Sequence, residues 1–526
     1  MTYRLLLIAF TFIFYTGLAQ VKNVEIKVGK PYKLTKGQPR NYFYDGRYTI
    51  ALKTSDRRVV TVQCFDTQTN TEVSKNIYTD LPEHEVQPPI ESNGNFYYLY
   101  HFYNGKEKKQ QLCSRRVNVA QGTLEPAVVI CSTSPTVTIL FEEDITPILP
   151  VHFKITKSFD SSKVLITYRV KPKSRNDDSN FDVWGYHVLD KDLKPLWNKE
   201  VQMPYVQTKM NKWSSAVTSQ GKVYQLIYSN INKYELLLIK QDTIETHLLD
   251  LMPELRASEF HLNETKDGNV MCTCFYTSEI LTSTGKDYRM AISSALDVKV
   301  YISDGLYFAE VSPDGKLIQE GKYEIPLDLL NAYEDEKTRT LNKEKESLGA
   351  AGQRDIKITN HLYTEDGGCI IIGEQQYYDL SAQFYDKYAH ATIVYGQIYA
   401  IKLDAQGKLV WIKKLPKKQS SYYKIRGMGM KSFTLNGYVY IIYLDTPGSE
   451  FKENDVALEG QTLTVRKMNE ETGEYRKYSL GGSNDIPGTT RMLFLMKRVA
   501  GNGERSTIEV EAGQDLETTV VFDLMN

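Results

Sequence analysis

Residues 436–445 read NGYVYIIYLD, a polar turn followed by a strand of aromatic and β-branched residues. The same two-part pattern occurs seven times along the chain. Asp-Gly and Asn-Gly are strong signals for a β-hairpin, because both residues tolerate a positive φ. The seven turns are Asp45-Gly46, Asn93-Gly94, Ser161-Ser162, Gln220-Gly221, Asp267-Gly268, Asp366-Gly367 and Asn436-Gly437.

A second hairpin follows most of these strands, as in IYAIKLDAQGKLVW at residues 398–411. Each repeat therefore contains four strands, and the repeats follow one another at irregular intervals of roughly 45 to 100 residues. One four-stranded sheet cannot bury both of its faces, so repeated sheets stack around an axis and cover one another. The repeat predicts an all-β fold, namely a single β-propeller of about seven four-stranded blades.

Other β architectures fit the repeat less well. A β-sandwich does not predict seven similar hairpin pairs, and a β-solenoid has shorter and more regular periods. Six or eight blades remain open, because the strands near Val24–Val28 and Thr518–Phe522 have no assigned partner. We expect one of these two strands to close the ring by completing a blade.

Residues 398–419 resemble a segment found in a group of uncharacterised exported β-propeller-like proteins. Their Asp-x-x-Gly-x-x-x-Trp spacing also looks like the repeats of quinoprotein-type propellers. Only Trp197 and Trp411 occupy the Trp position here, whereas nearly every blade of quinoprotein dehydrogenases carries it. The resemblance therefore implies a fold without an activity, and we expect no cofactor.

The first 19 residues have the three parts of a secretory signal peptide. Arg4 supplies the positive charge, Leu5–Tyr15 is almost wholly apolar, and Gly17 and Ala19 place small residues at a cleavage site. The apolar run is too short for a comfortable membrane span, and no later stretch reaches that length. We expect residues 20–526 to form an exported propeller domain, periplasmic, extracellular or surface-associated, with no transmembrane segment in the mature chain.

The composition is that of a folded soluble protein, with 41% apolar residues, 25% charged residues and a formal charge of −1. This balance provides no broad electrostatic attraction for nucleic acid or an anionic membrane, so neither is expected as a partner. The 37 tyrosines favour β structure. The six cysteines lie in apolar strand-like runs, which favours buried thiols, with a Cys113–Cys131 disulfide as the alternative.

The repeat also predicts where the long connections lie. The turns within each hairpin share one face of the disc, so the links between hairpins and between blades emerge on the opposite face, here called the long-loop face. Within these links, residues 328–348 read as a helix, which predicts a helical insertion at about 327–350 between blades five and six. Long loops in a compact domain are usually functional. The long segments are residues 132–150, 171–182, 277–303, 326–356, 377–396 and 445–461.

The segment from Tyr377 to Gly396 is rich in aromatic residues and also contains carboxylates. Exposed aromatic rings beside carboxylates suit carbohydrate or peptide binding. The alternative is that the rings form a small core that holds the long loop in place. The candidate ligand-binding residues are Tyr377, Tyr378, Tyr385, Asp386, Tyr388 and His390.

Catalytic motifs are missing from the sequence. It has no Gly-x-Ser-x-Gly elbow, no His-Glu-x-x-His and no Walker loop, and the pair His84-Glu85 lacks a second His at metal-binding spacing. The residues Asp178, Asn180 and Asp182 have the spacing of a calcium loop, but Val183 stands where the loop requires Gly. We therefore expect no metal site, with these three residues as the alternative.

Two functions from different classes remain. The favoured one is a non-catalytic binding or scaffold module that holds a carbohydrate or a cell-surface protein on the long-loop face. The alternative is a hydrolase or lyase acting on polysaccharide or peptide at the mouth of the central channel. Two close carboxylates, or a His-Tyr pair at hydrogen-bond distance in a deep pocket, would favour the enzyme.

Overall fold

The structure is a computed structural model that describes most of the chain. The described residues are 24–38, 40–133, 137, 152–171, 180–206, 209–229, 233–249, 251, 256–257, 259–282, 299–347, 351–379, 392–421, 428–445, 462–482, 496–513 and 515–524. The predicted signal peptide, residues 1–19, lies outside them.

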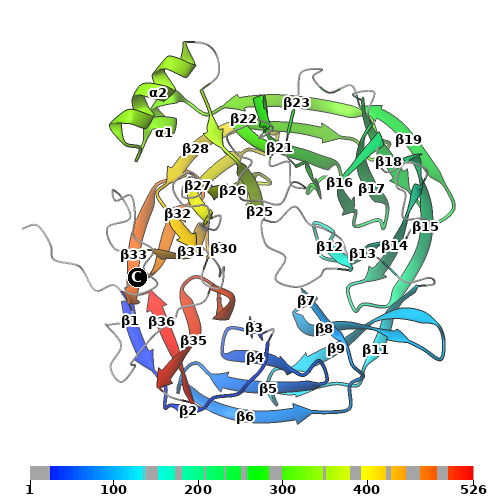
Figure 1. Ribbon diagram of the computed structural model, residues 1–526, viewed down its shortest axis with the longest axis vertical. Coiled ribbons are helices and arrows are strands. Elements are labelled where there is room, and N and C mark those ends of the chain that lie inside the picture. The colour runs from blue at the N-terminus through cyan, green and yellow to red at the C-terminus, as the bar shows by residue number, and fades with distance from the viewer. Residues whose placement is uncertain are drawn as a thin grey trace, which may run out of the picture.

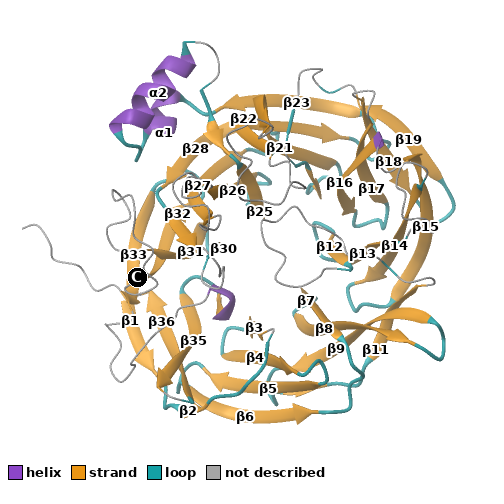
Figure 2. Cartoon of the chain, in the orientation of Figure 1, coloured by secondary structure: helices purple, strands orange, loops and turns teal. Residues whose placement is uncertain are grey.

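Eight antiparallel sheets stand around a common axis and form one closed ring (Figure 1). The first strand of each sheet lies nearest the axis, and the fourth lies at the rim. Strands make up nearly the whole ring, whereas the two helices α1 (Leu327–Asn331) and α2 (Glu336–Glu346) project from its edge (Figure 2). The predicted single β-propeller is confirmed, but the predicted number of about seven blades is wrong.

The first four blades follow one another along the chain. Blade 1 contains β3 (Arg40–Tyr44), β4 (Tyr48–Ser55), β5 (Val59–Asp66) and β6 (Thr71–Tyr78). Blade 2 contains β7 (Glu85–Ser92), β8 (Asn95–Asn104), β9 (Lys109–Asn118) and β10 (Thr123–Leu124), with β11 (Val128–Thr133) also paired to β9. Blade 3 contains β12 (Lys154–Lys157), β13 (Lys163–Arg169), β14 (Phe181–Asp190) and β15 (Pro195–Val206). Blade 4 contains β16 (Met210–Val217), β17 (Val223–Ser229), β18 (Lys233–Ile239) and β19 (Ile244–Leu249).

Blades 5 to 7 continue the same order. Blade 5 contains β20 (His261–Glu264), β21 (Val270–Thr282), β22 (Lys299–Val311) and β23 (Leu317–Glu324), with β24 (Gln353–Arg354) paired to β22. Blade 6 contains β25 (Ile356–Tyr363), β26 (Cys369–Asp379), β27 (Thr392–Leu403) and β28 (Leu409–Leu415), with β29 (Gln419–Ser421) paired to β27. Blade 7 contains β30 (Met430–Leu435), β31 (Tyr438–Asp445), β32 (Thr462–Asn469) and β33 (Tyr475–Gly482). All seven predicted turns join the first two strands of blades 1 to 7.

The eighth blade joins the two ends of the chain. A short 3₁₀ helix, Met496–Arg498, leads into β34 (Val499–Gly501), β35 (Arg505–Gly513) and β36 (Leu516–Leu524). The strand β1 (Val24–Val28) forms the outer edge by pairing with β36, and β2 (Tyr32–Lys33) pairs with the other end of β36. The two strands without assigned partners in the sequence therefore pair with each other, which adds the blade that the prediction missed.

The helical insertion lies between β23 and β24, as predicted. It consists of two helices, α1 (Leu327–Asn331) and α2 (Glu336–Glu346), and the Asp335 carboxylate caps α2 by accepting a hydrogen bond from the Thr338 amide. Lys414 Nζ of blade 6 donates to Glu334 Oε1 at 2.7 Å and to the Leu330 carbonyl at 2.8 Å, which ties the insertion to the ring. Within the part of the chain that the structure describes, neither helix has the length and apolar character needed to cross a bilayer.

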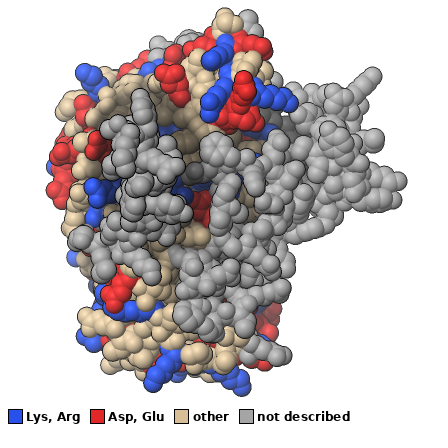
Figure 3. All heavy atoms as spheres, turned by 90° about the vertical axis from the view of Figure 1, so that its left-hand side faces the viewer, with Lys and Arg blue, Asp and Glu red and all other residues tan. Residues whose placement is uncertain are grey.

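Apolar side chains fill seven of the eight blade-to-blade interfaces, from the pair 1 and 2 to the pair 7 and 8. The cysteine thiols contribute to this packing, since all six cysteines are buried and free. Charged side chains of both signs mix over the surface seen from the side of blades 6 to 8 and on the helical insertion at its top (Figure 3). Apolar contacts between blades therefore hold the ring together. Among the described residues visible on that side, neither sign of charge forms a large patch.

Candidate functional site

A pocket of about 610 Å³ opens on the long-loop face beside blades 1, 2 and 3. Its walls come from the links that the topology places on this face: the β4–β5 turn, the connection into β7, the end of β8, the segment before β12 and the residue after β13. The lining residues are Arg57, Glu83, His84, Glu85, His101, Phe102, Tyr103, Gln110, Val137, His152 and Lys171.

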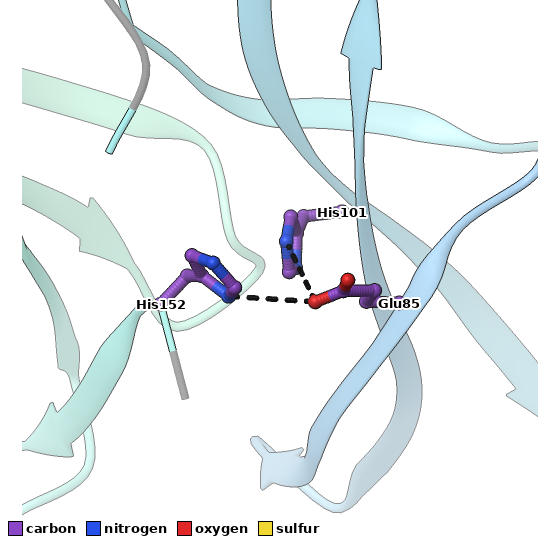
Figure 4. A group of neighbouring side chains, drawn as sticks. All are labelled: Glu85, His101 and His152. Atoms are coloured by element: carbon purple, nitrogen blue, oxygen red, sulfur yellow. Dashed lines mark ion pairs between the residues drawn. The ribbon is translucent and has the colours of Figure 1, made fainter. Parts of the chain in front are cut away.

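Three side chains of types that can ligate a metal meet in this pocket. Glu85 begins β7 and lies directly opposite His101 of β8 in the antiparallel register, while His152 comes from the segment that leads into blade 3. Glu85 Oε2 lies 3.6 Å from His101 Nε2 and 3.6 Å from His152 Nδ1. The two imidazole rings have centroids 4.4 Å apart, and the carboxylate points toward both of them (Figure 4). One ligand atom from each residue lies within 4.8 Å of the other two.

Burial determines the charge of this group. The His101 side chain is 2% exposed, and burial together with the neighbouring His152 and His84 lowers its pKa to about 3. His101 is therefore a neutral imidazole at neutral pH, and its contact with Glu85 is no ion pair. Glu85 Oε2 is buried and accepts no hydrogen bond from the described residues. A neutral imidazole beside a buried carboxylate oxygen can ligate a cation or exchange a proton.

Gln87 holds the His101 ring from behind. Gln87 Nε2 lies 3.0 Å from His101 Nδ1 and 3.2 Å from the Val86 carbonyl, while Gln87 Oε1 is buried without a hydrogen-bond partner among the described residues. The ring tautomer and the amide orientation are coupled. If the amide donates to Nδ1, then Nε2 carries the proton, whereas a reversed amide accepts from Nδ1–H and leaves the Nε2 lone pair toward Glu85.

A His-Tyr pair lies in the wall beneath the pocket. His84 Nε2 is 2.8 Å from the Tyr98 hydroxyl, which also contacts Thr54 Oγ1 at 3.1 Å. Tyr98 is fully buried and does not line the pocket. The pair meets the distance that would favour an enzyme, but its tyrosine cannot reach a ligand.

Two of the six predicted ligand-binding residues are described, and these two lie away from the pocket. Tyr377 and Tyr378 belong to β26 of blade 6, on the opposite side of the ring from blades 1 to 3 (Figure 1). The Arg354 guanidinium lies 4.3 Å from the centre of the Tyr377 ring. Tyr385, Asp386, Tyr388 and His390 lie outside the described residues, so their role stays a prediction.

The calcium candidate is only partly described. The Asp182 carboxylate is buried and accepts hydrogen bonds from Arg169 at 3.0 and 2.7 Å. Asn180 precedes β14, and Asp178 lies outside the described residues. The one described carboxylate of this set is therefore engaged by a cation of the protein itself.

The sequence interpretation missed Glu85, His101 and His152. It considered His84-Glu85 and dismissed the pair because no second His follows at a motif spacing. The other two residues of the group are His101, from the next strand, and His152, from the entry to the next blade. A straight count from the Asn93-Gly94 turn would place Val86 opposite His101, so only the register shift between Gln87 and Ile90 in the structure shows that Glu85 meets His101.

No protein-family model matches the chain, and no curated protein matches it. It is similar in structure to a protein of unknown function from Bacteroides caccae, at 10% identity over 70% of this chain and 94% of that one, with a TM-score of 0.29. It is also similar to the β-propeller domain of the Trilobed protease from Pyrococcus furiosus, at 9% identity over 86% and 95%, with a TM-score of 0.35. A third similar structure is a polysaccharide lyase described as an ulvan lyase, at 10% identity over 83% and 93%, with a TM-score of 0.37. The likeness to quinoprotein-type repeats stays a prediction.

Proposed function

We propose that the chain is an exported binding module that holds a carbohydrate chain on its long-loop face, in the pocket beside blades 1 to 3. The observation that carries this proposal is the pocket itself. Its volume of about 610 Å³ lies within the range of roughly 300–1,000 Å³ that small-ligand sites occupy. It also lies on the face from which the links between hairpins and between blades emerge, and the loops of a rigid scaffold commonly carry function.

The lining chemistry favours a carbohydrate over an apolar ligand. Sugar hydroxyls need donors and acceptors, which Gln110 and the Glu85 group supply, and sugar rings pack against aromatic faces such as that of Tyr103. Tyr103 is 52% exposed, so its ring is accessible. Arg57 and Lys171 are exposed cations on the same lining, which suits a sugar with carboxylate or sulfate groups.

The test is a glycan array and a peptide array probed with residues 20–526. We expect binding to acidic glycans, weakened about tenfold or more in the Tyr103→Ala and Lys171→Ala variants, since one well-placed contact contributes about 1.4 kcal/mol or more. The matched control is Tyr333→Ala, which removes an exposed ring from the helical insertion.

Other outcomes contradict the proposal in different ways. Binding to peptides alone would indicate a protein partner. Binding that survives both pocket variants but is lost in the Tyr385→Ala, Tyr388→Ala double variant would move the site to the aromatic segment of blade 6.

A hydrolase or lyase is the second candidate, and the neutral His101 beside Glu85 is the observation that favours it. Burial keeps this imidazole unprotonated at neutral pH but also makes it a weak base. The general base of such an enzyme would therefore be the neighbouring Glu85 carboxylate, whose Oε2 accepts no hydrogen bond from the described residues. Incubation of each bound polysaccharide with the chain distinguishes the two functions. New reducing ends indicate hydrolysis, new ultraviolet absorbance of unsaturated sugars indicates elimination, and intact polysaccharide indicates a binding module.

A further inference from the structure

We propose that Glu85, His101 and His152 bind one zinc ion, with a fourth coordination position open to the pocket. This site goes beyond carbohydrate binding and does not depend on it, since the metal is measured without any sugar present. Nothing in the linear sequence marks it, because the three residues come from two strands of blade 2 and the entry to blade 3.

The donor set is one that zinc uses. Two imidazoles and one carboxylate are the protein ligands of catalytic-type zinc sites, which keep their fourth position for water or a ligand. All three side chains here line the pocket, so a fourth position would face its interior. The Glu85 charge offsets half of the charge of a divalent ion.

The spacing of the donor atoms suits a tetrahedral ion. With metal–ligand distances of about 2.0–2.1 Å, neighbouring tetrahedral ligands lie about 3.3–3.4 Å apart, whereas neighbouring octahedral ligands lie about 2.8–3.0 Å apart. The two distances from Glu85 Oε2 to the ring nitrogens are both 3.6 Å. A movement of a few tenths of an ångström brings Glu85 Oε2 to tetrahedral spacing from both ring nitrogens. The ligating nitrogens of the two rings, which lie within 4.8 Å of each other, must move closer by more than that.

Two buried polar atoms gain partners when the ion is present. Glu85 Oε2 accepts no hydrogen bond from the described residues, and a buried carboxylate oxygen without a partner is costly. Gln87 Oε1 is likewise buried and accepts no hydrogen bond from the described residues. If the Gln87 amide reverses, its carbonyl accepts from His101 Nδ1–H and His101 Nε2 can ligate, at the loss of the 3.2 Å bond to the Val86 carbonyl. A hydrogen bond of this kind behind a ligating His is the usual outer support of a metal site.

The experiment titrates zinc into residues 20–526 after exhaustive treatment with a chelator. We expect one tightly bound zinc per chain by calorimetry and elemental analysis, and at least a hundredfold weaker binding in His152→Ala and Glu85→Gln. These two residues are the more exposed members, at 13% and 35%, so their replacement leaves the fold intact, which circular dichroism checks. His101 is too buried to serve as the test.

The matched control is His261→Ala. His261 Nε2 also lies beside a carboxylate, 3.4 Å from Glu259 Oε1, but among the described residues that pair belongs to no group of three ligands. This variant should bind zinc as the unaltered chain does. Cobalt in place of zinc should give the intense visible absorption of a tetrahedral site.

Three results would overturn the assignment. Absence of tight zinc binding would leave the cluster as a Glu-His contact within the protein. Zinc binding that is unchanged in both variants would place the ion elsewhere. Preferential binding of Fe²⁺ or Mn²⁺ with an octahedral cobalt spectrum would show that the same residues hold a different class of metal.

Discussion

Several histidine side chains are buried in the described part of the ring. Burial lowers the pKa of four histidines in the described part of the ring, to about 3 for His101 and His361, to about 4 for His187, and in the same direction for His84. Each of these rings stays neutral in the folded protein, whereas in the unfolded chain it titrates near 6.5. The unfolded state therefore binds more protons than the folded state below that pH.

This difference predicts that the free energy of unfolding changes little between pH 8 and pH 7 and falls as the pH drops from 6.5 toward 4. The upper part of this window, above pH 5, belongs to the imidazoles, because carboxyl groups titrate lower. Urea unfolding between pH 8 and pH 5, with a chelator present, measures the effect. His361→Gln should flatten the slope, since it removes one titrating ring outside the proposed zinc site. An unfolding midpoint that does not change between pH 7 and pH 5 would contradict the prediction.

In strand β14, a glycine lies where the aromatic ring of a neighbouring tyrosine crosses the strand. Gly185 lies opposite Tyr168 in the antiparallel register, and a Cβ built on Gly185 would lie 2.0 Å from Tyr168 Cζ. Tyr168 is fully buried, and its hydroxyl donates to Glu200 at 3.0 Å, so the ring has nowhere to move. The missing side chain of Gly185 is therefore what lets this tyrosine fill the interface between blades 2 and 3.

We expect Gly185→Ala to lower the free energy of unfolding by about 1–3 kcal/mol, the usual cost of forcing an extra methyl group into a packed core. Gly105→Ala is the control, since a Cβ there meets no atom within 4 Å and φ is not positive. Chemical denaturation of both variants against the unaltered chain gives the comparison. Equal stability of the two variants would mean that Tyr168 can shift after all.

Buried ion pairs connect the last blade of the ring to the first. The interface between blade 8 and blade 1 contains a buried ionic group, the closure cluster, formed by Arg40, Lys53, Glu509 and Glu517. Lys53 Nζ donates to Glu509 Oε1 at 2.5 Å and to Glu517 Oε2 at 2.8 Å, and Arg40 also pairs with both carboxylates. Burial alone would raise the pKa of Glu509, but Lys53 and Arg40 hold it below its usual value. The two ends of the chain are therefore joined by ion pairs as well as by the β1–β36 pairing.

Lys53→Met should destabilise the protein by about 3–5 kcal/mol, because removal of one partner leaves a buried carboxylate without full compensation. Lys316→Met is the matched control: that lysine pairs with Asp314 at 3.0 Å on the surface, where it is 80% exposed, and its loss should leave stability nearly unchanged. Urea unfolding of both variants tests the difference. A Lys53 variant as stable as the control would show that strand pairing alone closes the ring.

Local signals along the chain were enough to predict seven blades. Each Asp-Gly or Asn-Gly turn and the strand after it occupy only a few neighbouring residues, so their geometry depends little on the rest of the molecule. The eighth blade had a local signal as well, since Asn502-Gly503 forms its first turn with φ +94° at Gly503. Its outer strand, however, comes from the other end of the chain, and no local pattern joins β1 to β36.

Local sequence patterns are sufficient to predict the repeat, the all-β class, the helical insertion and the face on which the long links emerge. How the ring closes and which side chains meet in the pocket depend on contacts that only the folded chain makes. A straight count from the Asn93-Gly94 turn would place Val86 opposite His101, but a bulge at the two prolines between Gln87 and Ile90 moves Glu85 into that position. His152 reaches the same point only because blade 3 packs against blade 2. Turns and the alternation of polar and apolar residues along a strand are encoded over a few residues. Register shifts and contacts between blades depend on residues far apart in the chain.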